Sequence, residues 1–303
     1  MALSTKIIKK RIRSIGNTRK ITKAMEMVST VKMRKAVQAV LATRPYAASA
    51  WEMMGELLAR MGEGAKHPLL ETRPEVKRSA CIVITSNRGL CGGFNAQVLA
   101  AALRHAQGQT GIINTWIVVG KRGGEFLARN QQAIAAEFPK ADVITGVDEI
   151  SALLKMIITD FTTGTYDRVY VAYTDFISAM IQKPRIRQLL PLEKSPDSLL
   201  GGVGQDIKKS VQSETDILEF LFEPSVDVVL EAFLPHVVEI QLYQALLEST
   251  ASEHSARMLT MKNASNAAAD MVEELTLAFN QARQASITRE IAEITGGKAA
   301  LEQ

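Results

Sequence analysis

The sequence is poor in cysteine, in aromatic residues and in long apolar runs, and each shortage excludes a class of protein. Its 303 residues include two cysteines, Cys81 and Cys91, too few for a disulfide framework or a tetrahedral metal site. We therefore expect two reduced thiols in a reducing compartment. No run approaches the roughly 18 apolar residues of a membrane span. Aromatic residues make up only 5% of the chain, which favours helix packing through small side chains.

Acidic residues are scarce at the start of the chain. Residues 1–44 hold twelve lysines and arginines against one acid, Glu26, whereas residues 226–303 hold eleven acids against five bases. The net charges of +11 and −6 make the two ends complementary, although the whole chain carries only +4. The basic start resembles a transit peptide, but its apolar pattern continues into residues that cannot be a presequence. It also lacks the apolar core and cleavage site of a secretory signal.

A long apolar stripe marks residues 224–294 and predicts one very long helix. Alternating steps of four and three residues give eighteen positions, of which fourteen are apolar: Val226, Leu230, Phe233, Val237, Ile240, Gln244, Leu247, Ala251, His254, Met258, Met261, Ser265, Ala268, Val272, Leu275, Phe279, Ala282 and Ser286. This spacing is typical of a coiled-coil seam. At ~1.5 Å per residue the helix is roughly 100 Å long, so it needs a partner of similar length.

Proline and glycine set the expected ends of this helix. Pro224 suits a first turn, where its missing N–H is no loss, and the pair Gly296–Gly297 predicts a stop. Pro235 falls inside the pattern and predicts a kink or a separate short first segment.

The expected partner is a helix over residues 3 to about 62. Its regular seam runs through Ala36, Val40, Thr43, Ala47, Ala50, Met54, Leu57 and Met61. Pro45 predicts a local bend near Arg44. If both helices start from the same body, one runs toward it and the other away from it. The sequence therefore predicts an antiparallel pair with both termini near its far tip.

The middle of the chain has a different period and predicts an α/β domain. We expect strands at 79–85, 115–119, 141–145, 168–173 and 185–190, and helices at 94–106, 124–136 and 148–161. Strands alternating with helices predict a mainly parallel, doubly wound, Rossmann-like sheet. Residues 194–214 have the composition of a loop, and 217–223 of an extended piece. The expected organisation is thus 1–62 helix, 76–193 α/β domain, 194–223 loop and foot, and 224–296 helix.

The residues offer little chemistry. A glycine-rich stretch, Gly89–Asn95, follows a strand and precedes a helix, but its spacing fits neither a dinucleotide fingerprint nor a phosphate-binding P-loop, so a tight turn is the simpler interpretation. Cys91 has no sequence signature that ties it to any of the four histidines. His254 falls on the seam, which indicates an interface residue. We expect no catalytic residue, cofactor or metal.

Two interpretations remain at this level. A basic helix leading into a coiled coil is compatible with nucleic-acid binding, because its lysines and arginines would follow phosphates. The other interpretation is a mechanical or scaffold protein that inserts its helical hairpin into a larger assembly with acidic inner surfaces. The acidic C-terminal helix beside the basic one would repel phosphate, which favours the second.

Four motifs carry a resemblance across nearly the whole chain. They are residues 21–27 with 32–35 (ITKAMEM and KMRK), 88–93 (RGLCGG), 252–258 (SEHSARM) and 280–288 (NQARQASIT). Together and in this order they closely resemble the gamma subunits of F-type ATP synthases. The resemblance implies the same architecture, an antiparallel coiled coil of the terminal helices with a Rossmann-like domain between them in sequence.

The resemblance also implies a function and partners. In that family the coiled coil is the central shaft inside a ring of alternating alpha and beta subunits, three of each. Its foot binds the epsilon subunit and the ring of c subunits in the membrane. Ion flow turns the shaft, which drives the beta sites through their conformations, so nucleotide chemistry belongs to beta. A gamma subunit alone is then not an enzyme.

By motif position the resemblance assigns contact residues. Arg283 and Gln284 match the pair that bonds a catch loop of beta. Lys23 and Met25 lie where the shaft faces the acidic loop of beta, and Arg88 resembles another contact to that region.

Two further assignments concern the rest of the chain. Arg257 matches a polar shaft residue near its partner contacts, and Phe220, Phe222 and Glu223 match the foot on the c ring. Residues 185–215 lack the cysteines of the chloroplast regulatory insertion, and no transit extension precedes the first motif. The resemblance therefore favours a bacterial complex at the cytoplasmic face of the inner membrane.

Overall fold

The computed structural model describes residues 5–61, 67–144, 146–192 and 226–301. They belong to two compact units, residues 1–28 with 258–303, and residues 29–257. This division differs from the four consecutive segments expected from the sequence, because it cuts both terminal helices. The expected loop and foot, residues 194–223, lie outside the described residues.

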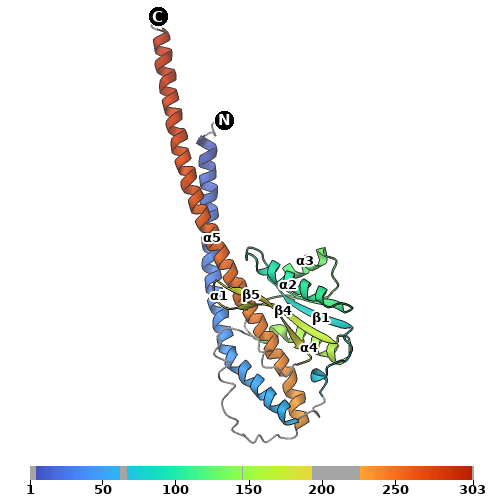
Figure 1. Cartoon of the computed structure of the whole chain (residues 1–303). Coiled ribbons are helices and arrows are strands. Elements are labelled where there is room, and N and C mark those ends of the chain that lie inside the picture. Colours follow the sequence, from blue (N-terminus) through green and yellow to red (C-terminus); the bar gives the residue numbers. More distant parts are fainter. Residues whose placement is uncertain (1–4, 62–66, 145, 193–225, 302–303) are drawn as a thin grey trace. The chain divides into compact units, whose positions relative to one another are not determined.

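Two long helices, α1 (Thr5–Met61) and α5 (Val226–Leu301), dominate the chain. The expected stop at Gly296–Gly297 was wrong, since α5 continues through both glycines. Helix propensity costs only about 1 kcal/mol per glycine, so a pair of them does not by itself end a helix. Pro235 lies inside α5 without splitting off a first segment. Pro45 lies inside α1, whose lighter-blue part changes direction within the 29–257 unit (Figure 1).

A five-stranded sheet forms the centre of the 29–257 unit. Its order is β3-β2-β1-β4-β5, with β5 antiparallel to β4 and the other pairs parallel. The strands are β1 (Arg78–Ile84), β2 (Ile113–Val119), β3 (Ile134–Phe138), β4 (Arg168–Phe176) and β5 (Gln182–Leu190). The burial of β1 and β4 on both faces explains their unbroken apolar runs. The expected doubly wound sheet is therefore present.

Helices cover both faces of this sheet. The connecting helices are α2 (Phe94–Gly108), α3 (Lys121–Arg129) and α4 (Asp148–Thr162), and a short 3₁₀ turn, η2 (Pro68–Leu70), precedes β1. One core joins α2 and α3 to the sheet, through residues such as Val98, Trp116 and Leu127. The other and larger core joins α4 to the sheet together with the 29–61 part of α1 and the 226–257 part of α5.

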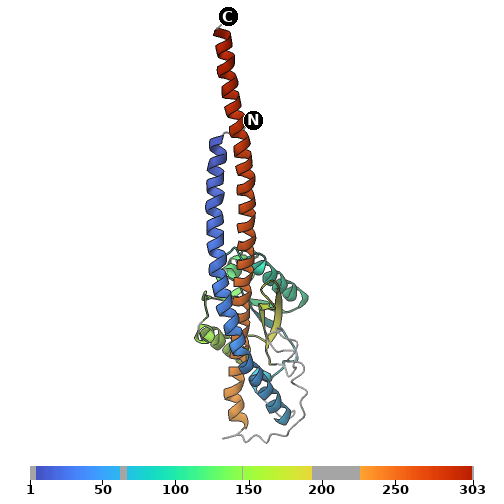
Figure 2. The same ribbon diagram turned by 90° about the vertical axis from the view of Figure 1, so that its left-hand side faces the viewer.

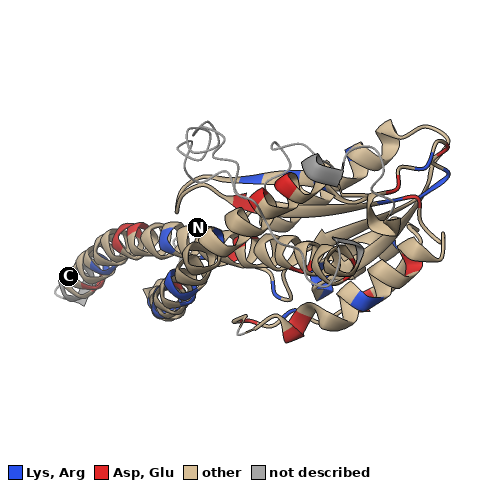
Figure 3. Ribbon diagram, turned by 90° about the horizontal axis from the view of Figure 1, so that it is seen from below, with Lys and Arg blue, Asp and Glu red and all other residues tan. Residues whose placement is uncertain are grey.

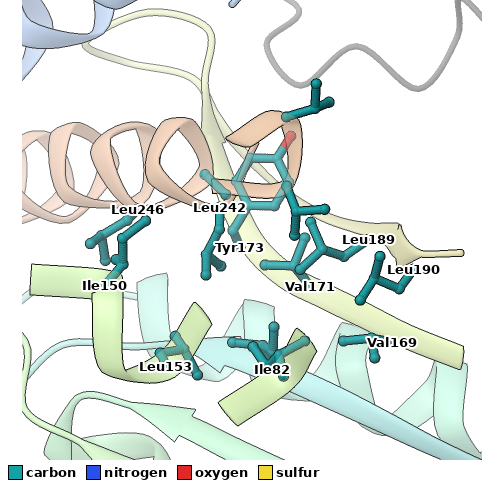
Figure 4. Close-up of a cluster of buried hydrophobic side chains, with 14 of the residues drawn as sticks. Ile82, Ile150, Leu153, Val169, Val171, Tyr173, Leu189, Leu190, Leu242 and Leu246 are labelled. Carbon is teal, nitrogen blue, oxygen red and sulfur yellow. The ribbon is translucent and has the colours of Figure 1, made fainter. Parts of the chain in front are cut away.

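The larger core shows how α5 is attached to the domain. Leu242 and Leu246 of α5 point toward Ile150 and Leu153 of α4, and Tyr173 of β4 lies beside them (Figure 4). Burying each of these side chains contributes on the order of 1.5 to 3 kcal/mol. This part of α5 is thus an element of the domain core.

One stretch of the sheet domain was assigned wrongly from sequence. The helix expected over 124–136 ends at Arg129, and the strand expected over 141–145 is replaced by β3 at Ile134–Phe138. Gln131, at φ 55°, turns the chain between the two elements. Along β3 the side chains alternate between half-buried and exposed positions, which is the period of an edge strand.

The second unit consists of the ends of the two long helices. Residues 5–28 of α1 run antiparallel beside the later part of α5 (Figure 2). Met261, Ser265 and Ala268 are buried where the predicted seam requires small or flexible side chains. The segment starting at the N-terminus carries mainly basic positions, whereas the C-terminal one carries both signs (Figure 3). From residue 283 to 295 every side chain of α5 is exposed.

Candidate functional site

The carboxyl edge of the sheet is where a doubly wound domain usually binds a ligand. Chain order reverses between β1 and β4, which places the switch point of this sheet between those two strands. Here the place is taken by α5. Ser252 Oγ donates to the Thr174 carbonyl of β4 at 3.1 Å, and Arg257 Nη2 donates to the Arg88 carbonyl after β1 at 3.1 Å. We call this contact region of α5, residues 252–257, the helix seat.

A buried ion-pair network forms the centre of the helix seat. Lys140, which follows β3, lies 2.6 Å from Glu253 through Nζ and Oε2, and the two side chains are 2% and 8% exposed. Arg257 Nη1 donates to the other Glu253 oxygen, Oε1, at 2.9 Å. Burial alone would raise the pKa of Glu253, but Lys140 and Arg257 hold it below its ordinary value. Glu253 is therefore an ionised carboxylate with a cation on each oxygen.

His254 completes the network as a neutral residue. Its Nε2 lies 3.0 Å from the Asp142 carbonyl, and its Nδ1 lies 3.4 Å from Arg257 Nη1. These partners require that Nε2 carries the hydrogen and that Nδ1 accepts. Burial, together with the charges of Arg257 and Lys140, lowers the pKa of His254. A seam histidine has thus become a contact between α5 and the sheet domain, as the sequence indicated.

The glycine-rich loop is closed by its own hydrogen bonds. Asn95 Oδ1 accepts from the Ser86 amide at 3.0 Å, and Asn95 Nδ2 donates to Ser86 Oγ at 2.7 Å. Cys91 is buried beside these two residues, with its Sγ 3.4 Å from Asn95 Nδ2. The loop therefore turns the chain tightly, in agreement with the simpler interpretation. The 88–93 motif also supplies the carbonyl oxygens of Arg88 and Gly89 that Arg257 binds, so it meets the 252–258 motif in space.

A second turn supports α5 from the other side. Ser255 Oγ donates to the Ala179 carbonyl, in the turn between β4 and β5, at 2.6 Å. Gln182 of β5 reaches the same hydroxyl at 3.4 Å. The small side chains of the 252–258 motif are thus needed for close approach and for donors to backbone carbonyls.

The contact residues assigned by motif lie in different surroundings. In the unit of helix ends, Lys23 is exposed and pairs with Glu26 at 3.0 Å, and Met25 is half-buried. Arg283 and Gln284 are exposed on α5. Their contacts with other subunits remain predictions.

The remaining assignments fall in the 29–257 unit or on residues without description. Arg88 is exposed. Arg257 is 9% exposed, and its guanidinium donates hydrogen bonds to Glu253 and to the Arg88 carbonyl. These contacts favour a role within the chain. Phe220, Phe222 and Glu223 lie outside the described residues.

Sequence reasoning missed the partners of the helix seat. Glu253 and Arg257 stand four residues apart, a spacing that predicts an ion pair on one helix face, and that signal was available. Lys140 and Asp142 gave none, because their partners on α5 lie more than 110 residues away.

The described residues contain no group of three or more histidine, cysteine, aspartate or glutamate side chains placed to hold a metal ion. Among the same residues, no helix has the length and hydropathy to span a membrane.

The fold and the helix seat define a class of protein in which a doubly wound domain lies between two long terminal helices in sequence, and the second helix occupies the carboxyl edge of its sheet. The family described as ATP synthase matches residues 4–301. The ATP synthase gamma chain of Chloroflexus aurantiacus is 46% identical over 98% of this chain and 99% of its own length. That of Herpetosiphon aurantiacus is 43% identical, with 99% coverage of each chain. The chain belongs to the ATP synthase gamma-chain family.

Solved structures agree on the fold. A chain of the Euglena gracilis mitochondrial ATP synthase, in a structure of OSCP, F1 and the c-ring, matches with a TM-score of 0.65 at 18% identity. The match covers 98% of this chain and 94% of that one. A chain of the Tetrahymena thermophila mitochondrial central stalk and c-ring matches with a TM-score of 0.61 at 24% identity, over 81% of this chain and 99% of that one.

Proposed function

We propose that this chain is the central rotor shaft of an F-type ATP synthase. Its partners are the alpha and beta subunits, three of each, the epsilon subunit and the ring of c subunits. Rotation of the ring turns the shaft, and the shaft drives the beta sites through the states that make ATP. The reverse reaction, ATP hydrolysis, pumps ions.

The observation that carries this proposal is the free end of α5. Residues 283–295 are exposed on every side, yet Ile287, Ile291 and Ile294 are apolar and lie on one face at helical spacing. An exposed apolar stripe at the end of a long helix requires an enclosing partner. A ring of subunits around the shaft supplies one, and gamma-chain relatives align over this segment.

The rotor transmits energy through differential contacts. A shaft changes the nucleotide affinity of a beta subunit only if it contacts one beta conformation better than another. We propose that Arg283 and Gln284 bond a catch loop of beta. Lys23, Met25 and Arg88 then face its acidic lower region, and Phe220, Phe222 and Glu223 belong to the foot on the c ring.

The chain itself is proposed to be non-catalytic. The crevice in which a doubly wound domain would hold a nucleotide is occupied by α5 through Ser252, Glu253 and Arg257. Catalysis then belongs to the beta subunits. Functionally we divide the chain into the shaft helices 1–62 and 224–296, the α/β domain 76–193 and the foot segment 194–223.

We place the complex at the cytoplasmic face of a bacterial inner membrane, where this subunit is peripheral. The relatives named above are bacterial proteins, which supports this placement. The nucleic-acid alternative receives no support from family membership. A gel shift with duplex DNA that weakens steeply with salt would revive it.

Co-purification at native expression level tests the proposal. An affinity tag on this chain should recover alpha and beta bands in a three-to-one excess over it. The isolated chain should show no ATP turnover once contaminating alpha and beta are removed. Recovery of the chain alone from membranes that contain an intact synthase would contradict the assignment.

A further inference from the structure

Two acidic side chains meet in the interior of the 29–257 unit. Asp175, near the carboxyl end of β4, and Glu248, on α5, both have 0% exposed surface. One helical turn after Glu248, Ser252 Oγ bonds the carbonyl of Thr174, the residue before Asp175, and Asp175 acts on the Glu248 carboxyl both by its charge and by hydrogen bonding. Asp175 forms an ion pair with Arg185 of β5, with Nε and Oδ2 2.7 Å apart. Two ionised carboxylates at this contact would repel one another where water cannot screen them.

The acid pair lacks hydrogen-bond donors when both carboxyl groups are ionised. Glu248 Oε1 accepts from Gln244 Nε2 at 3.1 Å. Glu248 Oε2 and Asp175 Oδ1 find no hydrogen-bond donor among the described residues as long as both acids are ionised. A proton on Glu248 Oε2 makes that atom a donor to Asp175 and satisfies both sides. Asp175 accepts this hydrogen bond while it pairs with Arg185.

The pair belongs to a line of polar contacts that crosses several elements. Thr43 Oγ1 of α1 donates to Gln244 Oε1 at 2.8 Å, and the Gln244 amide donates to Glu248. Asp175 and Arg185 extend the line through β4 to β5. A change at the acid pair therefore acts where α1, α5 and the sheet are joined.

We propose that Glu248 and Asp175 share one proton and form a latch that fixes α5 to the sheet, and that the latch weakens when this proton is lost.

The groups that face the pair make Glu248 the site of the charge change. The cationic neighbours are Arg44 of α1, which acts on Glu248, and Arg185 of β5, which pairs with Asp175. Arg187 of β5 acts on Tyr173. Burial, followed by the charges of Glu248 and Asp175, raises the pKa of Tyr173 on β4, so its hydroxyl stays neutral. Burial first, and then the charge of Asp175, raises the pKa of Glu248 to about 8.

The direction of the pH effect follows from the proton held by the folded state. The ordinary pKa of a glutamate is 4.5, so between pH 4.5 and about 8 the folded chain keeps a proton that the unfolded chain has lost. The latch is then at full strength below pH 4.5, weakens as pH rises, and levels off above about 8. In this window each increase of one pH unit raises the unfolding equilibrium constant by up to about tenfold, because the folded chain gives up the stabilisation of the shared proton.

Substitution of Glu248 by glutamine tests the latch in the full-length chain. In Glu248→Gln the side-chain amide still donates to Asp175 and still accepts from Gln244, but it carries no titrating proton. Urea unfolding between pH 5 and 9 should show a pH slope in the wild type that is smaller in Glu248→Gln, by up to about tenfold in the unfolding constant per pH unit. Glu273→Gln, an exposed acid on the same helix, is the matched control and should keep the wild-type slope. Equal slopes in Glu248→Gln and wild type would overturn the proposal.

Infrared spectroscopy of the wild-type chain gives a second readout that does not depend on the variant folding. A protonated carboxylic acid absorbs in a C=O stretching region separate from that of carboxylates. We expect one such buried group at pH 7 and its loss above pH 9. A spectrum with carboxylates only at pH 7 would refute the shared proton.

Discussion

The helix α5 passes through two environments, and their difference shows how one sequence pattern serves two purposes. In the 29–257 unit almost every side chain from Val237 to Ser255 is buried, including polar ones. In the unit of helix ends, only one seam is buried, through Met261, Ser265 and Ala268. The same four-and-three spacing runs through both. The seam alone therefore defines a helix pair, and the added burial identifies the stretch that anchors the domain.

The largest expected effect comes from breaking the helix seat. Lys140→Ala leaves a buried Glu253 with only Arg257 as partner, and we expect the free energy of unfolding to fall by about 3 kcal/mol, since removing one member of a buried pair typically costs 3–5 kcal/mol. Chemical denaturation of the full-length chain measures this.

Lys32→Ala is the matched control for that experiment. It removes a 3.0 Å pair with Asp142 in which Lys32 is 29% and Asp142 45% exposed, and it should cost less than about 1 kcal/mol. Equal losses in the two variants would show that the seat is not a buried network.

Truncation of two seam leucines compares the two environments directly. Leu247 is 1% exposed in the domain core, whereas Leu275 is half-buried in the helix pair. We expect Leu247→Ala to lower the free energy of unfolding by about 3 kcal/mol through a core cavity, and Leu275→Ala by about 1 kcal/mol, because its site is open to water. The order of the two midpoints in urea is the readout. A reversed order would make the helix pair the more tightly packed region.

An acid-sensitive group of contacts lies where β1 and β4 begin, at the amino end of the parallel strands. Asp167 accepts from the Lys77 and Arg78 amides and pairs with Arg73 at 2.8 Å. Burial opposes ionisation, but these donors lower the pKa of Asp167 to about 2. Its contribution is present above the ordinary aspartate pKa of 3.8 and disappears as pH falls through about 2.

We therefore expect Asp167→Asn to cost roughly 2 kcal/mol at pH 7 and progressively less below pH 4. Unfolding free energies of both chains between pH 2 and 7 should converge at the acid end. A difference that is constant across this range would point to lost packing instead of lost charge.

The smallest effect on stability is expected where the proposed function predicts a large effect on coupling. Arg283 and Gln284 are exposed, so the double alanine variant should unfold within about 0.5 kcal/mol of the wild type. In the assembled complex it should weaken the coupling of ATP hydrolysis to ion pumping. Unchanged hydrolysis and pumping would remove these two residues from the contact surface.

Much of the architecture was predictable because it depends on local periodicity. The four-and-three spacing correctly predicted that Leu247, Ala251 and Ala268 are buried. The apolar runs placed β1 and β4 within a few residues. The error at β3 arose because Ile134, Ala136 and Phe138 alternate over only five residues, too few to outweigh a helical pattern that precedes them.

The helix seat and the acid pair could not be predicted, because they depend on distant partners. Lys140 and Glu253, or Asp175 and Glu248, come together only after the strand order has formed. Sequence spacing does not show which edge of the sheet α5 crosses. Burial of Glu248 also contradicts the usual assumption that a helix glutamate faces solvent.

The occupation of the switch point by α5 has a consequence for exchange. A dinucleotide in that crevice would dissociate on dilution, whereas a helix joined to the domain by the same chain is present at a fixed effective concentration. The residues that hold α5 therefore need only modest affinity for it. The site does not depend on the concentration of a free ligand. The domain has in this sense become a holder for a permanent, covalently tethered ligand.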